Sequence, residues 1–66
     1  MIFSEKLIYA RACLNLTQTQ LAKELNVSFE TINRWESGKY TPSKKSEIVF
    51  DIFCKKNQII FEKENE

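Results

Sequence analysis

Two short segments with the periodicity of a helix follow each other with almost no chain between them. The first opens at Thr17, which together with Gln20 fits a capping box. The second opens at Ser28, a natural N-cap residue. The apolar residues that recur at helical spacing in these segments are Leu21, Ala22, Leu25, Ile32 and Trp35. This pattern predicts a helix-turn-helix unit over about residues 17–37.

The two sides of this unit differ in chemistry. Ala22 is a small residue at the expected crossing of the helices, where a larger side chain would push them apart. Trp35 is expected in the core, because its face of the second helix points inward. The outer face carries Glu30, Asn33, Arg34 and Ser37, with Phe29 at its edge. A helix with such a polar face fits the major groove, so we predict double-stranded DNA as the partner.

The rest of the chain is too short for a second domain. A chain of 66 residues must bury its apolar surface economically, and helices with short connections do this. A helix is expected from Ser4 to about Leu14, ended by Asn15, which tolerates the left-handed conformation. We therefore predict an all-α, compact four- to five-helix domain over residues 1–61, followed by a charged tail over 62–66.

A last helix is predicted to follow Pro42 and to run to about Lys56. Pro42 suits a first helical position, and Thr41 or Ser43 can cap the helix. The residues expected on its buried side are Ile48, Val49, Ile52 and Phe53. The apolar segment Ile59–Phe61 is compatible with a strand, an extended tail or a dimer contact.

Composition excludes several classes of protein. Two cysteines and no histidine argue against a metal site, and no cofactor is predicted. We expect Cys13 and Cys54 to be reduced thiols in the core of a cytoplasmic protein. No apolar run is long enough to span a membrane, and the charged N-terminus lacks the apolar segment of a signal peptide.

The net charge of +1 at first argues against a nucleic-acid partner. The last five residues, however, carry three acids and one base, and the remainder has nine basic and six acidic residues, a net of +3. Between Arg34 and Lys45 there are four basic residues and a single acid, Glu36. A local basic patch is therefore compatible with the modest total charge.

Several short motifs stand in order along most of the chain, from about Lys6 to Lys56. They are Leu16-Thr17-Gln18, Leu21-Ala22, Leu25, Val27-Ser28, Thr31-Ile32, Trp35-Glu36-Ser37-Gly38-Lys39 and Pro42-Ser43. In this order and at this spacing they resemble the Cro and phage-repressor (XRE) helix-turn-helix family. The resemblance implies a lambda-repressor-like fold and a role in transcription regulation. Asn26 stands in the turn where the family often has Gly, and Asn can adopt the same backbone conformation.

The resemblance also implies roles for individual residues. Gln18 matches a position that contacts DNA backbone or base. The positions that match the outward side of the recognition helix are Phe29, Glu30, Asn33 and Arg34, and we predict Ser28 and Ser37 at its two ends as DNA contacts as well. The positions that match a backbone-contacting loop are Lys39, Tyr40, Thr41 and Ser43. Arg11 and Glu36 match a pair that forms a partly buried salt bridge, and the helical wheel independently places Glu36 beside the core stripe.

Alternative roles remain open for the recognition residues. Glu30 can accept a hydrogen bond from cytosine N4, or complement the macrodipole at the helix N-terminus. Arg34 can bind guanine or a phosphate, and Phe29 can pack on a thymine methyl or fold back onto its own domain. Lys44 and Lys45 are expected on a solvated face with weak attraction to phosphates.

The leading hypothesis is a sequence-specific DNA binder that represses or activates transcription, acting as a weak or DNA-induced homodimer. The alternatives are a protein-interaction module with the same fold, or an antitoxin-like partner of another protein. An enzyme is not expected, because the chain has no histidine and no carboxylate pair or cysteine with a suitable partner.

Overall fold

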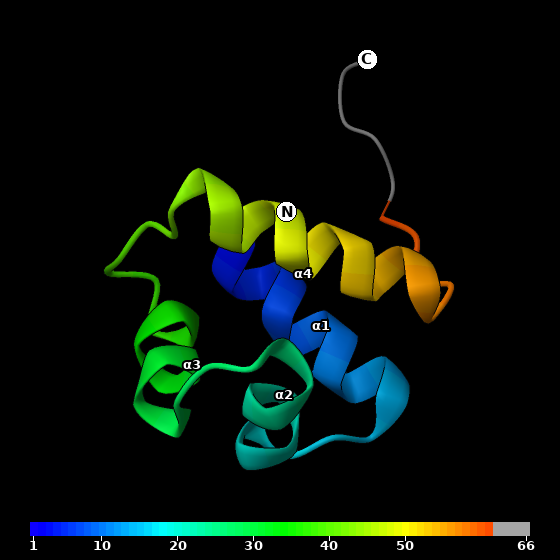
Figure 1. The fold of residues 1–66 in the computed structure, drawn as a ribbon, viewed down its shortest axis with the longest axis horizontal. Coiled ribbons are helices and arrows are strands. Elements are labelled where there is room, and N and C mark those ends of the chain that lie inside the picture. The colour runs from blue at the N-terminus through cyan, green and yellow to red at the C-terminus, as the bar shows by residue number, and fades with distance from the viewer. Residues whose placement is uncertain (62–66) are drawn as a thin grey trace.

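The computed structural model describes residues 1–61 and has four helices and no strand over that range (Figure 1). Their bounds are α1 Phe3–Leu14, α2 Gln18–Leu25, α3 Phe29–Glu36 and α4 Lys44–Lys56. The all-α prediction is confirmed, with four rather than five helices over the described residues. None of these four helices combines the length and apolarity that crossing a membrane would need. The predicted charged tail, residues 62–66, lies outside the described residues.

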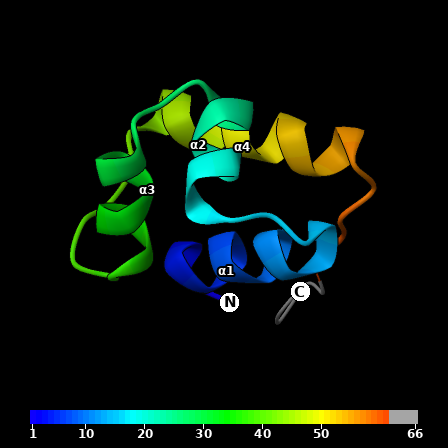
Figure 2. The same cartoon turned by 90° about the horizontal axis from the view of Figure 1, so that it is seen from below.

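The helices pack around one another with α3 at one end (Figure 1). Helix α4 runs along one side of the molecule above α1, and α2 lies on the opposite side (Figure 1). Helix α3 contacts both α1 and α2 and lies at the same end of the molecule in both views (Figure 2). One side of α3 is thus covered by the two preceding helices, and its other side is left open.

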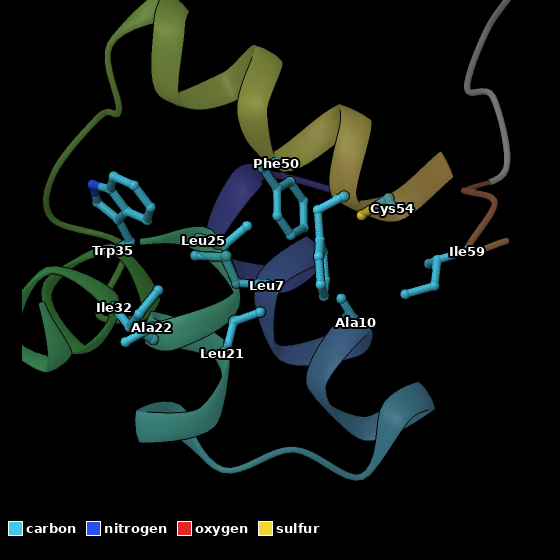
Figure 3. Close-up of a cluster of buried hydrophobic side chains, with 11 residues drawn as sticks. Leu7, Ala10, Leu21, Ala22, Leu25, Ile32, Trp35, Phe50, Cys54 and Ile59 are labelled. Carbon is cyan, nitrogen blue, oxygen red and sulfur yellow. The ribbon is translucent and has the colours of Figure 1, made fainter. Parts of the chain in front are cut away.

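A single cluster of buried side chains joins all four helices (Figure 3). Its members are Leu7, Ala10, Leu21, Ala22, Leu25, Ile32, Trp35, Phe50, Phe53, Cys54 and Ile59. Phe3 extends the cluster, with its ring centroid 5.4 Å from those of both Trp35 and Phe50 in edge-to-face contact. These contacts tie α3 and α4 to the start of α1, because edge-to-face geometry is favourable between aromatic rings.

Three helices end through a residue with a left-handed backbone. Asn15 follows α1 with a φ of 56°, and Asn26 follows α2 with a φ of 59°, as the sequence predicted. Gln58 has a φ of 60° just after α4. In each case the next amide donates to a carbonyl of the last turn: Leu16 to Arg11 at 2.9 Å, Val27 to Ala22 at 2.9 Å and Ile59 to Cys54 at 2.8 Å. This Schellman pattern reverses the chain within about two residues.

The predicted buried side of α4 is wrong in part. Phe53 is buried as expected, together with Phe50 and Cys54. The three aliphatic residues Ile48, Val49 and Ile52 are 53%, 39% and 59% exposed. The helix is apolar on both sides, so its periodicity alone cannot select a face. The aromatic side is buried because α1 supplies Phe3 as a matching partner.

Two smaller expectations, one about Pro42 and one about Cys13, also need correction. Pro42 is buried but precedes the helix rather than occupying its first position, because Ser43 is the N-cap and accepts from the Ser46 amide at 3.1 Å. Cys13 is exposed, whereas Cys54 is a core thiol as predicted. The sequence places Cys13 among apolar neighbours, but it lies on the outer side of α1.

The segment after α4 folds back onto the domain. Ile59 belongs to the core and is 7% exposed, whereas Ile60 is 82% exposed. The ring of Phe61 lies 5.6 Å from that of Tyr9, and the Lys6 Nζ lies 5.3 Å from the centroid of the Phe61 ring. Of the three alternatives for Ile59–Phe61, the structure therefore has an extended tail that packs on its own domain.

Candidate nucleic-acid interface

The starts of α2 and α3 are fixed by side-chain caps. Thr17 Oγ1 accepts from the Gln20 amide at 3.0 Å, and Gln20 Oε1 accepts from the Thr17 amide at 2.9 Å. Ser28 Oγ accepts from the Thr31 amide at 3.1 Å. The predicted capping box and N-cap are both confirmed. They define where each helix begins, and so the angle at which α3 leaves the turn.

The turn between α2 and α3 is tight and closely packed. Asn26 takes the left-handed conformation there, where Asn is more readily accommodated than most residues. Val27 is half-buried against the core, and Ala22 is only 4% exposed at the helix crossing. Because interiors are closely packed, a larger side chain at Ala22 would displace α3.

The side of α3 that faces away from the core is open along the whole helix. The exposed residues there are Phe29, Glu30, Asn33, Arg34 and Ser37. Phe29 is 44% exposed, so its ring does not fold into the core of the domain. The structure therefore brings together the residues that the sequence assigned to the outer face. Glu30 lies in the first turn of α3, where its charge also complements the macrodipole.

Gln18 has a different environment from the other predicted contact residues. Its side chain is half-buried, and Nε2 donates to Glu36 Oε1 at 2.9 Å. The same carboxylate accepts from Arg11 Nε at 2.7 Å and from Arg11 Nη2 at 3.0 Å. Arg11 Nη1 also donates to the Leu16 carbonyl at 3.1 Å. This network joins the end of α1, the start of α2 and the end of α3.

The Arg11–Glu36 pair is largely screened from solvent. The side chains are 24% and 8% exposed, and the hydrogen bond to Glu36 raises the pKa of Arg11 above its ordinary value. Two parallel N–H···O bonds fix the relative orientation of the two planar groups. The carboxylate accepts on both of its oxygens, so its fork orients the guanidinium and the Gln18 amide together.

Three serines predicted as DNA contacts have their hydroxyl groups engaged in local backbone capping. Ser28 and Ser43 are the N-caps of α3 and α4. Ser37 Oγ donates to the Arg34 carbonyl at 2.6 Å and accepts from the Lys39 amide at 3.3 Å. The capping role of Ser28 and Ser43 was readable from the sequence. That of Ser37 was not, because it depends on the path of the chain after α3.

The loop after α3 returns toward the outer face of the helix. Gly38 has a φ of 80°, a conformation that L side chains rarely adopt. Lys39, Tyr40 and Thr41 are all exposed beyond it. The Arg34 guanidinium carbon lies 5.0 Å from the centroid of the Tyr40 ring. The sequence gives no signal for this contact, since it joins a helix to a loop across the glycine turn.

The open side of α3 and the loop after it carry two exposed cations, Arg34 and Lys39, whereas Glu36 is engaged by Arg11 and Gln18. Lys44 and Lys45 are also exposed, in the first turn of α4. Glu30 is the exposed acid on this side of α3. Within residues 1–61 no group of three His, Cys, Asp or Glu is arranged to hold a metal ion. The open face therefore offers hydrogen-bonding and cationic groups suited to a nucleic acid.

Comparison with known proteins matches this part of the chain. A family model described as Helix-turn-helix matches residues 7–46. Over 46 residues the chain is 52% identical to the HTH-type transcriptional activator BcrR of Enterococcus faecalis, which is 70% of this chain and 22% of that protein. Over 40 residues it is 60% identical to an uncharacterized HTH-type transcriptional regulator of Methanocaldococcus jannaschii, which is 61% of each protein. The chain thus spans less than two thirds of the length of either relative, and no solved structure matches it significantly.

Proposed function

Because the chain belongs to the helix-turn-helix family of Cro and phage-repressor (XRE) proteins, we propose that it binds double-stranded DNA sequence-specifically and regulates transcription. The observation that carries this proposal is the open outer face of α3. That helix is held on its other side by the core, at its start by the Ser28 cap and at its end by the Arg11–Glu36 pair. A rigid helix with an exposed polar face can enter the major groove at little conformational cost.

The residues divide into two roles in this proposal. On α3, Phe29, Glu30, Asn33 and Arg34 face the bases, where hydrogen bonds and methyl contacts carry sequence information. The residues that approach the phosphates, and so position the helix, are Gln18, Ser28, Ser37, Lys39, Thr41 and Ser43, while Tyr40 in the same loop lies beside Arg34. Arg11 and Glu36 hold the scaffold.

We propose further that the protein acts on DNA as a weak or DNA-induced homodimer. Two copies would place two α3 helices about 34 Å apart, one turn of B-DNA, on a symmetric site. Footprints should therefore extend from one half-site to two as the protein concentration rises. A footprint that stays on one half-site at every concentration contradicts the dimer.

The proposal also includes the cytoplasmic location expected from the sequence, because a protein that binds DNA must have access to it.

Selection of bound duplexes from a random pool tests the main proposal directly. The wild-type protein should enrich a defined sequence, and its affinity for that duplex should fall steeply with salt, because phosphate contacts release counterions. If no sequence is enriched and duplex binding is absent at low salt, the proposed function is wrong.

One observation favours a second candidate function, a protein-interaction module. The exposed aliphatic residues Ile48 and Ile52 lie one turn apart on the outward side of α4, and Val49 lies at the edge of that side, near Leu25 and Trp35. Neighbouring apolar side chains on one face are typical of a protein contact. A stable complex with a protein partner, formed by a chain that binds no duplex, would support this function or an antitoxin-like role over DNA reading.

A further inference from the structure

The contact between Arg34 and Tyr40 lies outside the core and joins α3 to the loop that follows it. The guanidinium carbon of Arg34 is 5.0 Å from the centroid of the Tyr40 ring, and Tyr40 is 54% exposed. Gly38 reverses the chain before Tyr40, and the buried Pro42 anchors it two residues after. The backbone on both sides thus restricts where the ring can lie.

The geometry leaves the hydrogen-bonding edge of Arg34 available. A cation over an aromatic ring is attracted to the ring face, whereas the guanidinium N–H groups donate in their own plane. Among residues 1–61, no hydrogen bond or ion pair engages the Arg34 guanidinium. The side chain therefore has one partner that restrains it and five donors that remain unused.

A free arginine on a helix surface has many rotamers, and ordering it on binding costs conformational entropy. A partner that restrains the guanidinium before DNA arrives reduces that cost without competing for its donors. Phosphate contact by the Tyr40 hydroxyl, the role implied by the family resemblance, would not require the ring to lie over Arg34.

We propose that Tyr40 is a positioning residue, whose ring holds the Arg34 guanidinium as a preset fork on the outer face of α3. This inference rests on the proposed DNA-binding function and adds to it a route by which a loop residue influences base reading. Tyr40 acts through Arg34, so removing the ring should matter only while Arg34 is present.

A double-mutant cycle on the selected duplex tests the inference. The variants are Tyr40→Phe, Tyr40→Leu, Arg34→Ala and the double variant Arg34→Ala/Tyr40→Leu. Tyr40→Phe keeps the ring face and should bind within about twofold of wild type. Tyr40→Leu should weaken binding about two- to fivefold, the range of an exposed cation–π contact. In the Arg34→Ala background the same substitution should change the affinity by less than about 1.5-fold.

Two results would overturn the inference. Equal losses in Tyr40→Phe and Tyr40→Leu would assign the effect to the hydroxyl, and additive losses in the cycle would separate Tyr40 from Arg34. Thermal midpoints of all four variants show whether each is folded, and Tyr40→Phe serves as the matched control. If the wild-type protein binds and the cycle is additive, this inference alone fails. If the wild-type protein selects no duplex, the proposed function fails and the inference fails with it.

Discussion

Arg11 Nε lies 2.7 Å from Glu36 Oε2, and this ion pair joins the last turn of α1 to the last residue of α3. The pair holds the end of α3 opposite to its cap at Ser28. The orientation of the candidate recognition helix therefore depends on a contact that lies outside the candidate interface. Stability and DNA reading can accordingly be tested by different substitutions.

Arg11→Met should lower the free energy of unfolding. The substitution leaves a Glu36 carboxylate that is 8% exposed without its cation, and also removes the bond to the Leu16 carbonyl. We expect a loss of about 1.5–3 kcal/mol, the range of hydrogen bonds to charged groups, below the largest values for fully buried pairs. Chemical denaturation measures it.

The matched control for this substitution is Lys55→Met. Lys55 pairs with Asp51 at 3.4 Å within α4, but their side chains are 78% and 64% exposed. Such pairs contribute about 0.3–0.5 kcal/mol, so this variant should stay close to wild type. Equal effects of the two substitutions would contradict the structural role of the Arg11–Glu36 pair.

Ile59→Ala should destabilise the domain by about 2–4 kcal/mol, because it empties a buried position in the core. Ile60→Ala is its control, since Ile60 is 82% exposed and an exposed substitution changes stability by about 0.5 kcal/mol or less. Thermal unfolding compares the two variants. Similar midpoints for both would mean that the segment after α4 does not pack on the domain.

Gln58→Gly should stabilise the domain by about 1 kcal/mol. Gln58 has a φ of 60°, which strains an L residue with a Cβ atom but not glycine. Gln58→Ala retains the Cβ atom and should give no comparable gain. A Gly variant no more stable than the Ala variant in denaturant titrations would show that the backbone at this position carries no strain.

Cys54 should make stability depend on alkaline pH. Burial raises the pKa of this thiol from its ordinary value of 9.0 to about 11, so the folded protein retains a proton that the unfolded chain loses. Above pH 9 the thiol ionises in the unfolded chain but stays protonated in the folded protein, and this difference favours unfolding. The stability contributed by Cys54 is therefore lost between about pH 9 and 11. Wild type should therefore lose more stability than Cys54→Ala over this interval. Parallel curves for the two proteins would contradict the assignment.

The helix-turn-helix and its caps could be predicted because their signals are local. Thr17 and Gln20 form a box within one turn, and Asn26 provides the left-handed residue that the tight connection needs. Which side of α4 is buried could not be predicted, because both sides are apolar. The aromatic side is buried against Phe3, which is far away in the sequence.

The candidate site was predictable in the same uneven way. The exposure of Arg34 and Asn33 follows from helical period, which places them opposite Ile32 and Trp35. The bond from Gln18 to Glu36 and the contact of Tyr40 with Arg34 depend on how separate segments meet in space. No spacing within a single helix encodes either contact.

The central claim is that the outer face of α3 reads bases while the following loop contacts phosphates. Titration of wild type, Arg34→Ala and Lys39→Ala against the selected duplex and a scrambled duplex, at several salt concentrations, tests it most directly. Lys39→Ala should weaken binding to both duplexes alike and reduce the log–log salt slope by about one per half-site. Arg34→Ala should lose about 1–3 kcal/mol of binding free energy on the selected duplex. On the scrambled duplex its loss should be little more than that of removing one phosphate contact. Equal losses on both duplexes for Arg34→Ala would make Arg34 a phosphate contact, and unchanged binding by both variants would contradict DNA reading by this face.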